Sequence, residues 1–469
     1  MTDSQKVTID ESTINQLKVG FSGDLIFPDH SSYDEYRSIW NGMIDKRPAI
    51  IARCLNSSDV VQCVNFAREN DLLVAIKGGG HNVAGNAVCD GGIMIDLSLM
   101  KSVSVDPKAK TAKVEPGCLL GELDKETQKF GLVCPGGIVS TTGVAGYTLG
   151  GGFGWLSRKY GMTIDNLLSA DIVTADGKLL RCAKDENADL FWGIRGGGGN
   201  FGVATSFEFK LHDLGPEVFC GVIVFPFESA KKYIQFHREF LAKAPRELCA
   251  WMVIRHAPPL PFLPEDKHGK LAVIVPFLYA GDPVEGEKIV KPLREWGTTY
   301  GEHVGVMPFT AWQSLFDALN EPGARNYWKS HNLNELSDGF IDAILEYIEK
   351  FPVPTCEVFI AHLDGAVKDT PNDATAYAFR DAPFLMNVHT RWTDSSIDKK
   401  CIAWARGIFE ATKPYSAGSV YVNFMSDEGE DRVRDAYSHE TWNRLVELKN
   451  KYDPKNLFRL NQNIKPTAS

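Results

Sequence analysis

Residues 142–155 read Thr-Gly-Val-Ala-Gly-Tyr-Thr-Leu-Gly-Gly-Gly-Phe-Gly-Trp, one of three glycine clusters in the first half of the chain. The others are Lys-Gly-Gly-Gly-His at residues 77–81 and Gly-Gly-Gly-Gly-Asn-Phe-Gly at residues 196–202. Backbone N–H groups in successive turn conformations form concave anion-binding sites, and glycine permits the positive φ and close ligand approach that such turns need. One cluster could be a tight turn alone. Three in the same half of the chain favour a phosphate-bearing cofactor held at several points.

The third cluster matches the dinucleotide-binding pattern GxGxxG, but its context is wrong. In a true fingerprint the glycines open a helix. Here residues 203–211 alternate between apolar and polar side chains, which predicts a strand and excludes a Rossmann site. The chain also has no GxxxxGK[ST], GxSxG or HExxH motif, which excludes a P-loop and the commonest hydrolases.

Composition indicates a globular protein of two or three domains, with 469 residues of which 44% are hydrophobic and 23% charged. A formal charge of -10 argues against a nucleic-acid partner. No apolar run approaches the ~18 residues of a membrane span, so we expect no membrane partner. The 10 cysteines lie singly without a CxxC pair, so neither a disulfide framework nor a metal site is expected. Residues 1–17 lack the apolar stretch of a secretion signal, which predicts an intracellular, cytoplasmic protein.

The pattern of helix, strand and turn signals changes once along the chain. Residues 1–212 combine helix and strand patterns with the glycine-rich turns, which predicts an α+β domain. Residues 213–424 hold strand candidates at 222–225, 271–279, 357–362 and 384–392, with amphipathic helices between them at 230–241 and 336–350. This predicts a second domain of antiparallel sheet backed by helices. Residues 425–469 contain a helix at 439–451 that is followed by Asp453-Pro454.

Five segments in chain order carry a family resemblance. They are the cluster at 77–81, Pro-Gly-Gly at 135–137, the cluster at 142–155, Gly161-x-x-x-Asp165-Asn166, and Asp453-Pro454-x-Asn456-x-Phe458-x-x-x-Gln462. Together they resemble the vanillyl-alcohol-oxidase-type (PCMH-type) FAD-linked oxidases, and the last is similar to the berberine-bridge-enzyme-like branch. The resemblance implies a two-lobed fold with one FAD-binding domain built from residues 1–212 and 425–469. Residues 213–424 would then be a substrate domain whose sheet covers the isoalloxazine ring.

The resemblance also implies which residues bind FAD. They lie in the glycine clusters, in the segment before the second cluster, and near the C-terminus: Gly78, Gly79, Gly80, His81, Asn82, Gly85, Cys134, Pro135, Gly136, Gly137, Thr141, Thr142, Gly143, Gly146, Gly150, Gly151, Gly152, Gly154, Trp155, Asp165, Asn166, Gly199, Gly202, Val203, Tyr421, Asn461 and Asn463.

Two of these residues are expected to bind the flavin covalently. The position of His81 in its motif makes it the anchor to the flavin 8α-methyl group, a bond that raises the reduction potential. Cys134 precedes proline, as does the cysteine that bonds flavin C6 in doubly linked members such as gluco-oligosaccharide oxidase. A free cysteine is otherwise a small buried hydrophobe. The residues after Pro135 are closer to those of singly linked members.

The catalytic residues are expected on two segments. Tyr421 matches the first tyrosine of the family's Tyr-x-Asn-Tyr segment, whereas Phe424 replaces the second. Asn387 stands where relatives carry a catalytic Glu or Gln, and strand alternation places His389 on its face of the sheet. Because an amide cannot act as a base, the active site is remodelled, and Tyr421 could also be a buried aromatic with a satisfied hydroxyl.

The resemblance therefore implies an FAD-dependent oxidase. It would take hydride from an alcohol-type carbon of a sugar or secondary metabolite and reduce O2 to H2O2, with a small-molecule substrate and O2 as its partners. The alternatives are a flavin dehydrogenase with another acceptor and a flavin-binding protein with little turnover. The sequence leaves the substrate, the catalytic base and the oligomeric state open.

Overall fold

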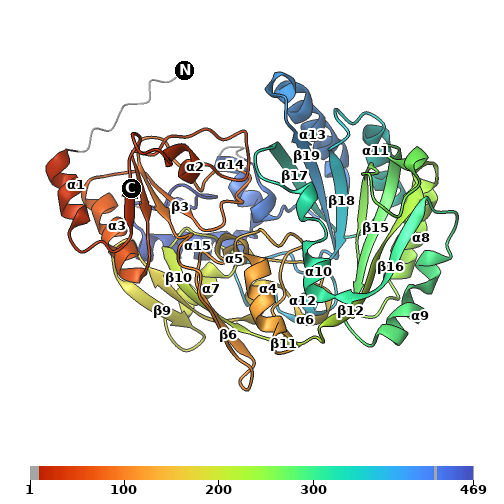
Figure 1. Ribbon diagram of the computed structural model, residues 1–469, viewed down its shortest axis with the longest axis horizontal. Coiled ribbons are helices and arrows are strands. Elements are labelled where there is room, and N and C mark those ends of the chain that lie inside the picture. The colour runs from red at the N-terminus through yellow and green to blue at the C-terminus, as the bar shows by residue number, and fades with distance from the viewer. Residues whose placement is uncertain (1–9, 427–429, 468–469) are drawn as a thin grey trace.

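A computed structural model describes residues 10–426 and 430–467 (Figure 1). Residues 1–9, which form half of the stretch used to exclude a secretion signal, lie outside the described residues. The chain forms two lobes of mixed helix and sheet, as expected. Among the described residues no helix could span a membrane, and no group of three or more side chains could hold a metal ion.

The first lobe contains two sheets. The first has the order β1 (Asp24–Ile26), β2 (Ile50–Arg53), β4 (Ile93–Asp96), β3 (Val74–Lys77), in which β2, β4 and β3 are parallel. Helix α3 (Ser57–Glu69) connects β2 to β3 and begins at Asn56, whose side chain accepts a hydrogen bond from the Asp59 N–H. Strand β3 therefore delivers the chain to the first glycine cluster.

The second sheet has the order β5 (Val103–Asp106), β6 (Thr111–Val114), β10 (Val203–Lys210), β8 (Leu167–Val173), β9 (Leu179–Ala183). Strand β10 begins immediately after the third glycine cluster and pairs antiparallel with β6 and β8. The strand predicted at this position is therefore confirmed.

Short elements complete the first lobe and its connections to the second. They are α1 (Glu11–Lys18), α2 (Tyr33–Arg37), α4 (Leu120–Gln128), β7 (Leu132–Val133), α5 (Val144–Leu149), α6 (Ser157–Tyr160), α7 (Ala188–Ile194), β11 (His212–Asp213), α10 (Phe309–Ser314), α12 (Ala366–Asp369) and α14 (Glu430–Val433).

The second lobe is built on one large antiparallel sheet. Its order is β16 (Gly301–Pro308), β12 (Glu217–Pro226), β15 (Leu271–Tyr279), β14 (Met252–His256), β18 (Glu357–His362), β19 (Phe384–Trp392), β17 (Arg325–Leu333), with β13 (Leu248–Ala250) beside β15. Helices α8 (Ala230–Leu241), α9 (Pro283–Arg294), α11 (Asp338–Ile348) and α13 (Asp398–Thr412) lie on its outer side (Figure 1). The predicted strands and helices of this lobe are confirmed, and the opposite face of the sheet turns toward the first lobe.

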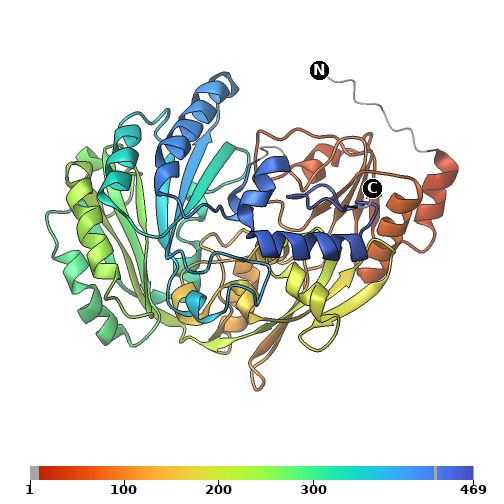
Figure 2. The ribbon, with the colours of Figure 1, turned by 180° about the vertical axis from the view of Figure 1, so that it is seen from behind.

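The C-terminal segment returns to the first lobe. Helix α15 (His439–Tyr452) lies across that lobe in the rear view, where it is dark blue (Figure 2). The fully buried Lys449 Nζ donates to the Asn200 carbonyl (2.9 Å) and pairs with Asp453 (2.6 Å). This packing agrees with a tail that belongs to the first domain, although the expected domain boundaries stay predictions.

Candidate active site

A cavity of about 1170 Å³, its mouth included, lies between the two lobes. The first lobe contributes the loop that follows β3 and the segment from Gly137 to Tyr147. The second lobe contributes Trp251, Trp328, Glu357, Phe359 and His389 from its sheet, and Asn320 from a loop. Tyr421, Asn423 and Phe424, on the segment that returns toward the first lobe, complete the lining.

The loop after β3 presents backbone to the cavity because two glycine clusters touch there. A Cβ atom on Gly79 would lie 2.5 Å from the Cα of Gly143, and Gly80 has a φ of +70°. A side chain at Gly79 would collide with backbone, and one at Gly80 would be strained. The two clusters are thus held together, and their N–H groups remain available to a ligand.

His81 follows this loop and faces the cavity. Its Nε2 lies 3.4 Å from Thr141 Oγ1, and its ring stacks on the indole of Trp40 with centroids 5.3 Å apart. Burial lowers the pKa of His81 to about 4. The imidazole is therefore neutral at neutral pH and carries a nucleophilic lone pair.

Tyr421 approaches the cavity from the opposite end. Its Oη accepts hydrogen bonds from the Gly152 N–H (2.9 Å) and from Asn423 Nδ2 (2.9 Å). Asn423 needs Gly150 beside it, since a Cβ there would lie 2.0 Å from the Asn423 amide oxygen. Burial raises the pKa of Tyr421 well above its usual range, and the two N–H donors only partly oppose this. Tyr421 is therefore a protonated phenol, and its hydroxyl proton can be donated to an acceptor on the cavity side.

The sheet face over the cavity carries one polar row. Register places Arg255 opposite Glu357, Glu357 opposite His389, and His389 opposite Trp328, across β14, β18, β19 and β17. Glu357 accepts from Arg255 Nη1 (2.5 Å) and lies 3.0 Å from His389 Nδ1. Burial raises the pKa of Glu357, but Arg255 and His389 outweigh it and bring the pKa to about 2. Glu357 is therefore an ionised carboxylate and a weak base.

Both ring nitrogens of His389 face acceptors. Nδ1 faces Glu357, and Nε2 lies 3.3 Å from Oδ1 of Asn326, whose amide is oriented by its own donation to the Ala324 carbonyl (2.8 Å). No lone pair of the ring is directed at the cavity. The geometry therefore does not favour His389 as the catalytic base, which the sequence left open, and its place among the catalytic residues stays a prediction.

Comparisons with known proteins agree with this geometry. A family model described as FAD binding domain matches residues 48–183, and one described as berberine and berberine like matches residues 420–465. An FAD-linked oxidoreductase of Dictyostelium discoideum is 34% identical over 433 residues, which is 91% of each chain. The chain belongs to the berberine-bridge-enzyme-like FAD-linked oxidoreductases.

Two further comparisons extend the likeness. (R)-6-hydroxynicotine oxidase of Paenarthrobacter nicotinovorans is 32% identical over 460 residues, covering 96% of this chain and 98% of its own. A crystal structure of 6-hydroxy-D-nicotine oxidase from Arthrobacter nicotinovorans is 29% identical and matches with a TM-score of 0.85 over 95% of this chain and 98% of its own. The family resemblance, the PCMH-type fold and the assignment as an FAD-linked oxidoreductase are thereby confirmed.

The residues present fit the FAD of this family. The paired glycine clusters offer backbone N–H groups to phosphate, as described above. Near the C-terminus, the side-chain oxygens of Asn461 and Asn463 are buried and have no hydrogen-bond donor within the described residues. Buried acceptors of this kind require a partner, and a ligand with N–H donors, such as a flavin ring, would supply one.

The predicted FAD residues divide into two groups. Those that line the cavity are Gly78, Gly79, Gly80, His81, Asn82, Gly137, Thr142, Gly143, Gly146 and Tyr421. The remaining ones lie outside its lining: Gly85, Cys134, Pro135, Gly136, Thr141, Gly150, Gly151, Gly152, Gly154, Trp155, Asp165, Asn166, Gly199, Gly202, Val203, Asn461 and Asn463.

Cys134 does not line the cavity, and its bond to the flavin stays a prediction. It is 1% exposed in an apolar cluster with Leu120, Leu132 and Val144, and burial raises its pKa far above the usual range. The part of this segment that lines the cavity is residues 137–139. The geometry therefore supports the interpretation of Cys134 as a buried hydrophobe, not as a second flavin anchor.

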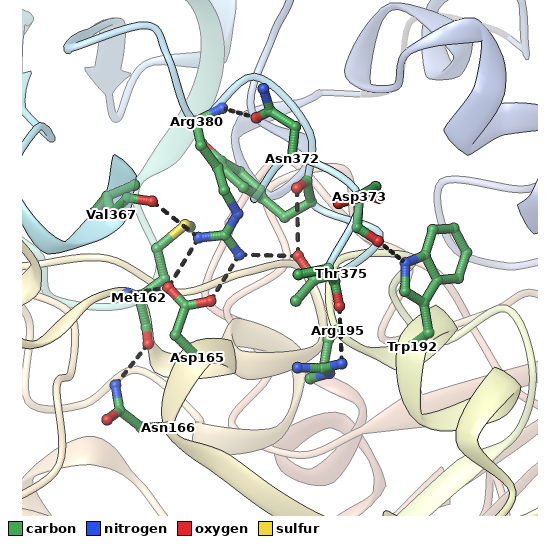
Figure 3. A network of polar contacts seen from close by, with 12 residues as sticks. Met162, Asp165, Asn166, Trp192, Arg195, Val367, Asn372, Asp373, Thr375 and Arg380 are labelled. Atoms are coloured by element: carbon green, nitrogen blue, oxygen red, sulfur yellow. Dashed lines mark hydrogen bonds and ion pairs between the residues drawn. The ribbon is translucent and has the colours of Figure 1, made fainter. Parts of the chain in front are cut away.

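Asp165 and Asn166 have structural partners (Figure 3). The carboxylate of Asp165 accepts two hydrogen bonds from Arg380 of the second lobe (2.7 and 2.9 Å) and one from the Met162 N–H. Asn166 Nδ2 donates to the carbonyls of Tyr160 and Met162. Neither side chain lines the cavity, and their assignment to the cofactor stays a prediction.

Three further predicted residues also serve packing. Trp155 is 2% exposed among aromatic rings, with Trp251 at 5.0 Å and Trp312 at 5.1 Å. A Cβ on Gly202 would meet the Val173 carbonyl at 2.5 Å, and Val203 pairs with Val173 in the sheet. By contrast, Gly199 faces open space, so a ligand can still approach the backbone there.

Asn387 occupies the next row of the sheet, opposite Phe359 and Ser330. It is 0% exposed, and both its amide atoms lack partners within the described residues. It shares the face of His389, as alternation predicted, but it does not line the cavity.

Sequence reasoning missed three residues at the site. Glu357 begins a predicted apolar strand, where a lone charge could have signalled a role, but its partners come from two other strands. Trp40 and Trp328 lie in segments to which no motif drew attention. Trp40 contacts His81 within the first lobe and Trp328 contacts His389 within the second, whereas their contact with each other depends on the packing of the two lobes.

Proposed function

We propose that the protein is an FAD-dependent oxidase that takes hydride from an alcohol-type carbon of a small molecule and reduces O2 to H2O2. The observation that carries this proposal is the pairing of His81 and Tyr421 at one cavity, each brought there by a different part of the chain. The similarity to (R)-6-hydroxynicotine oxidase supports an oxidase over other flavin chemistries.

His81 would hold the cofactor through its 8α-methyl group, with the glycine clusters around the phosphates. When bound, the isoalloxazine ring accepts hydride from the substrate carbon and passes the electrons to O2. A neutral His81 suits this attachment, because the lone pair of the ring is free at neutral pH. We propose a single covalent link, since Cys134 lies outside the cavity lining.

Tyr421 would orient the substrate. Because its Oη already accepts two N–H hydrogen bonds, its own O–H is the donor that a substrate oxygen or nitrogen would meet. The same N–H donors would stabilise negative charge on Oη when a proton moves between Tyr421 and the substrate.

Aromatic rings would cover the rest of the substrate. Trp251, Phe359 and Phe424 line the cavity beside Tyr421 and provide an apolar surface with no charge. Besides the Tyr421 hydroxyl, Glu357, His389 and Asn320 offer polar groups to the substrate. This arrangement suits a substrate with an apolar or ring-shaped body and a polar substituent.

The test starts from protein loaded with FAD. Anaerobic photoreduction followed by mixing with air should give rapid return of the oxidised flavin spectrum and release of H2O2. A panel of sugars, secondary alcohols, phenols and cyclic amines should contain compounds that bleach the flavin without air. Slow reoxidation in air together with fast reoxidation by a quinone or dye would identify a dehydrogenase. Absence of bleaching by every class would favour a flavin-binding protein with little turnover.

A further inference from the structure

The indole of Trp40 lies at the junction of both lobes and the loop that carries His81. Its ring is stacked on His81, with an interplanar angle of 18°, and packs edge-on against Trp328 at 5.5 Å. The Arg391 guanidinium lies over the same indole, 5.5 Å from its centroid. Trp40 is 4% exposed, although no motif or family argument assigns it a role.

The backbone and side chain of Trp40 are anchored on both sides. Its N–H donates to the Gly80 carbonyl (3.0 Å), next to His81 in the chain. Its carbonyl accepts from the Gly323 N–H (3.1 Å), and its Nε1 donates to the Asn320 carbonyl (2.6 Å). The indole is therefore a rigid platform tied to the His81 loop and to the second lobe.

The neighbouring Asn41 strengthens this connection. Its Nδ2 donates to the Val83 carbonyl (2.7 Å) and to the Asn326 carbonyl (3.0 Å), and its Oδ1 accepts from the Asn326 N–H (2.9 Å). Residues 40–41 are thus hydrogen-bonded to the His81 loop on both sides of the histidine and connect this loop to the start of β17.

His81 itself has few other restraints. It follows three glycines, which supply no side chains to confine it, and its polar contact to Thr141 is long at 3.4 Å. The stack on Trp40 is then the contact that sets the plane of its ring. With Nε2 toward Thr141, Nδ1 is the ring nitrogen that has no other polar contact among the described residues.

We propose that Trp40 is the positioning residue that holds His81 for covalent attachment of the flavin, an inference that rests on the proposed FAD function. Attachment forms an N–C bond between His81 and the 8α carbon. One methyl C–H bond and one imidazole N–H bond break, and the two electrons and two protons leave with O2 as H2O2. Trp40 forms and breaks no bond in this reaction, so its effect is on the orientation of the His81 ring.

The experiment follows attachment directly. Apoprotein is mixed with FAD in air, and the flavin that stays with acid-precipitated protein is measured over time, beside the non-covalent occupancy. Trp40→Leu should slow attachment about 10- to 100-fold at equal occupancy, the range for a misoriented reacting group. Trp296→Leu is the matched control, because Trp296 packs on Phe225 and Tyr233 within the second lobe and does not line the cavity. It should attach FAD at the wild-type rate.

Trp40→Phe separates positioning from general packing. A smaller ring that cannot reach Asn320 should slow attachment about threefold, less than leucine does. Wild-type rates for the leucine variant at matched occupancy would overturn the proposal. Should the leucine variant fail to bind FAD, an unchanged rate in Trp40→Phe overturns it instead. Wild-type protein that binds FAD without any covalent link also overturns this inference, whereas wild-type protein that takes up no FAD refutes the proposed function.

Discussion

The buried ion pair between Asp165 and Arg380 should be a major source of stability, and replacing Asp165 tests this. The side chains are 9% and 1% exposed, and two hydrogen bonds of 2.7 and 2.9 Å join them across the two lobes (Figure 3). Arg380 has further acceptors at the Thr375 hydroxyl and the Val367 carbonyl, but no second carboxylate among them. Asp165→Asn therefore leaves a buried cation without its counter-charge.

The expected loss is about 3–5 kcal/mol in the free energy of unfolding, the cost of breaking a buried pair by removing one partner. Urea denaturation followed by tryptophan fluorescence and circular dichroism measures it. The matched control is Asp369→Asn, since the Asp369–Arg246 pair has a similar distance of 2.8 Å but side chains 60% and 49% exposed. That control should cost no more than about 1 kcal/mol.

Two outcomes would refute this reasoning. If Asp165→Asn lowers the free energy of unfolding no more than the control does, the buried pair is not a major source of stability. Unchanged stability of the apoprotein together with weaker FAD binding would restore the cofactor role that the motif implied for Asp165. In the double variant Asp165→Leu with Arg380→Met, part of the loss should be recovered, because no buried charge remains unpaired.

Three other predictions concern the site and its pH dependence. Tyr421→Phe should slow substrate-driven flavin reduction by roughly 10²–10⁴-fold in anaerobic stopped-flow, and an unchanged rate would remove Tyr421 from the chemistry. Cys134→Ala should leave the acid-stable flavin content unchanged, and its loss would restore the second link. Burial lowers the pKa of His237 to about 3 and of His331 to about 4, below the unfolded value of 6.5. Each histidine therefore takes up a proton on unfolding below pH 6.5. As the pH is lowered from 6.5 to 4, the free energy of unfolding should decrease by about 1.4 kcal/mol per pH unit for each histidine. A denaturation midpoint that is flat over this interval in the wild type, or equally steep in His237→Gln, would contradict that assignment.

Local patterns were enough for most of the fold. The alternation at residues 203–211 identified β10 and excluded a Rossmann helix, because strand periodicity is a property of neighbouring residues. The same holds for the 384–392 strand, where alternation placed Asn387 and His389 on one face. Element ends were less accurate: the helix expected at residues 336–350 spans Asp338–Ile348, and the strand expected at residues 222–225 extends over Glu217–Pro226.

The sequence by itself determined the family, the two lobes and the glycine loops with His81, because these depend on short motifs and on backbone conformations that only glycine adopts readily. Only the tertiary structure decided which of those motif residues reach the cavity. Asp165 belongs to a motif segment, yet its partner Arg380 lies far along the chain in the other lobe. Glu357 acquires its role from Arg255 and His389, which lie opposite it on two different strands. Trp40 meets Trp328 only when the lobes are packed. Such pairings depend on long-range contacts, and residue identity along one segment carries no information about which distant side chain will fill the space beside it.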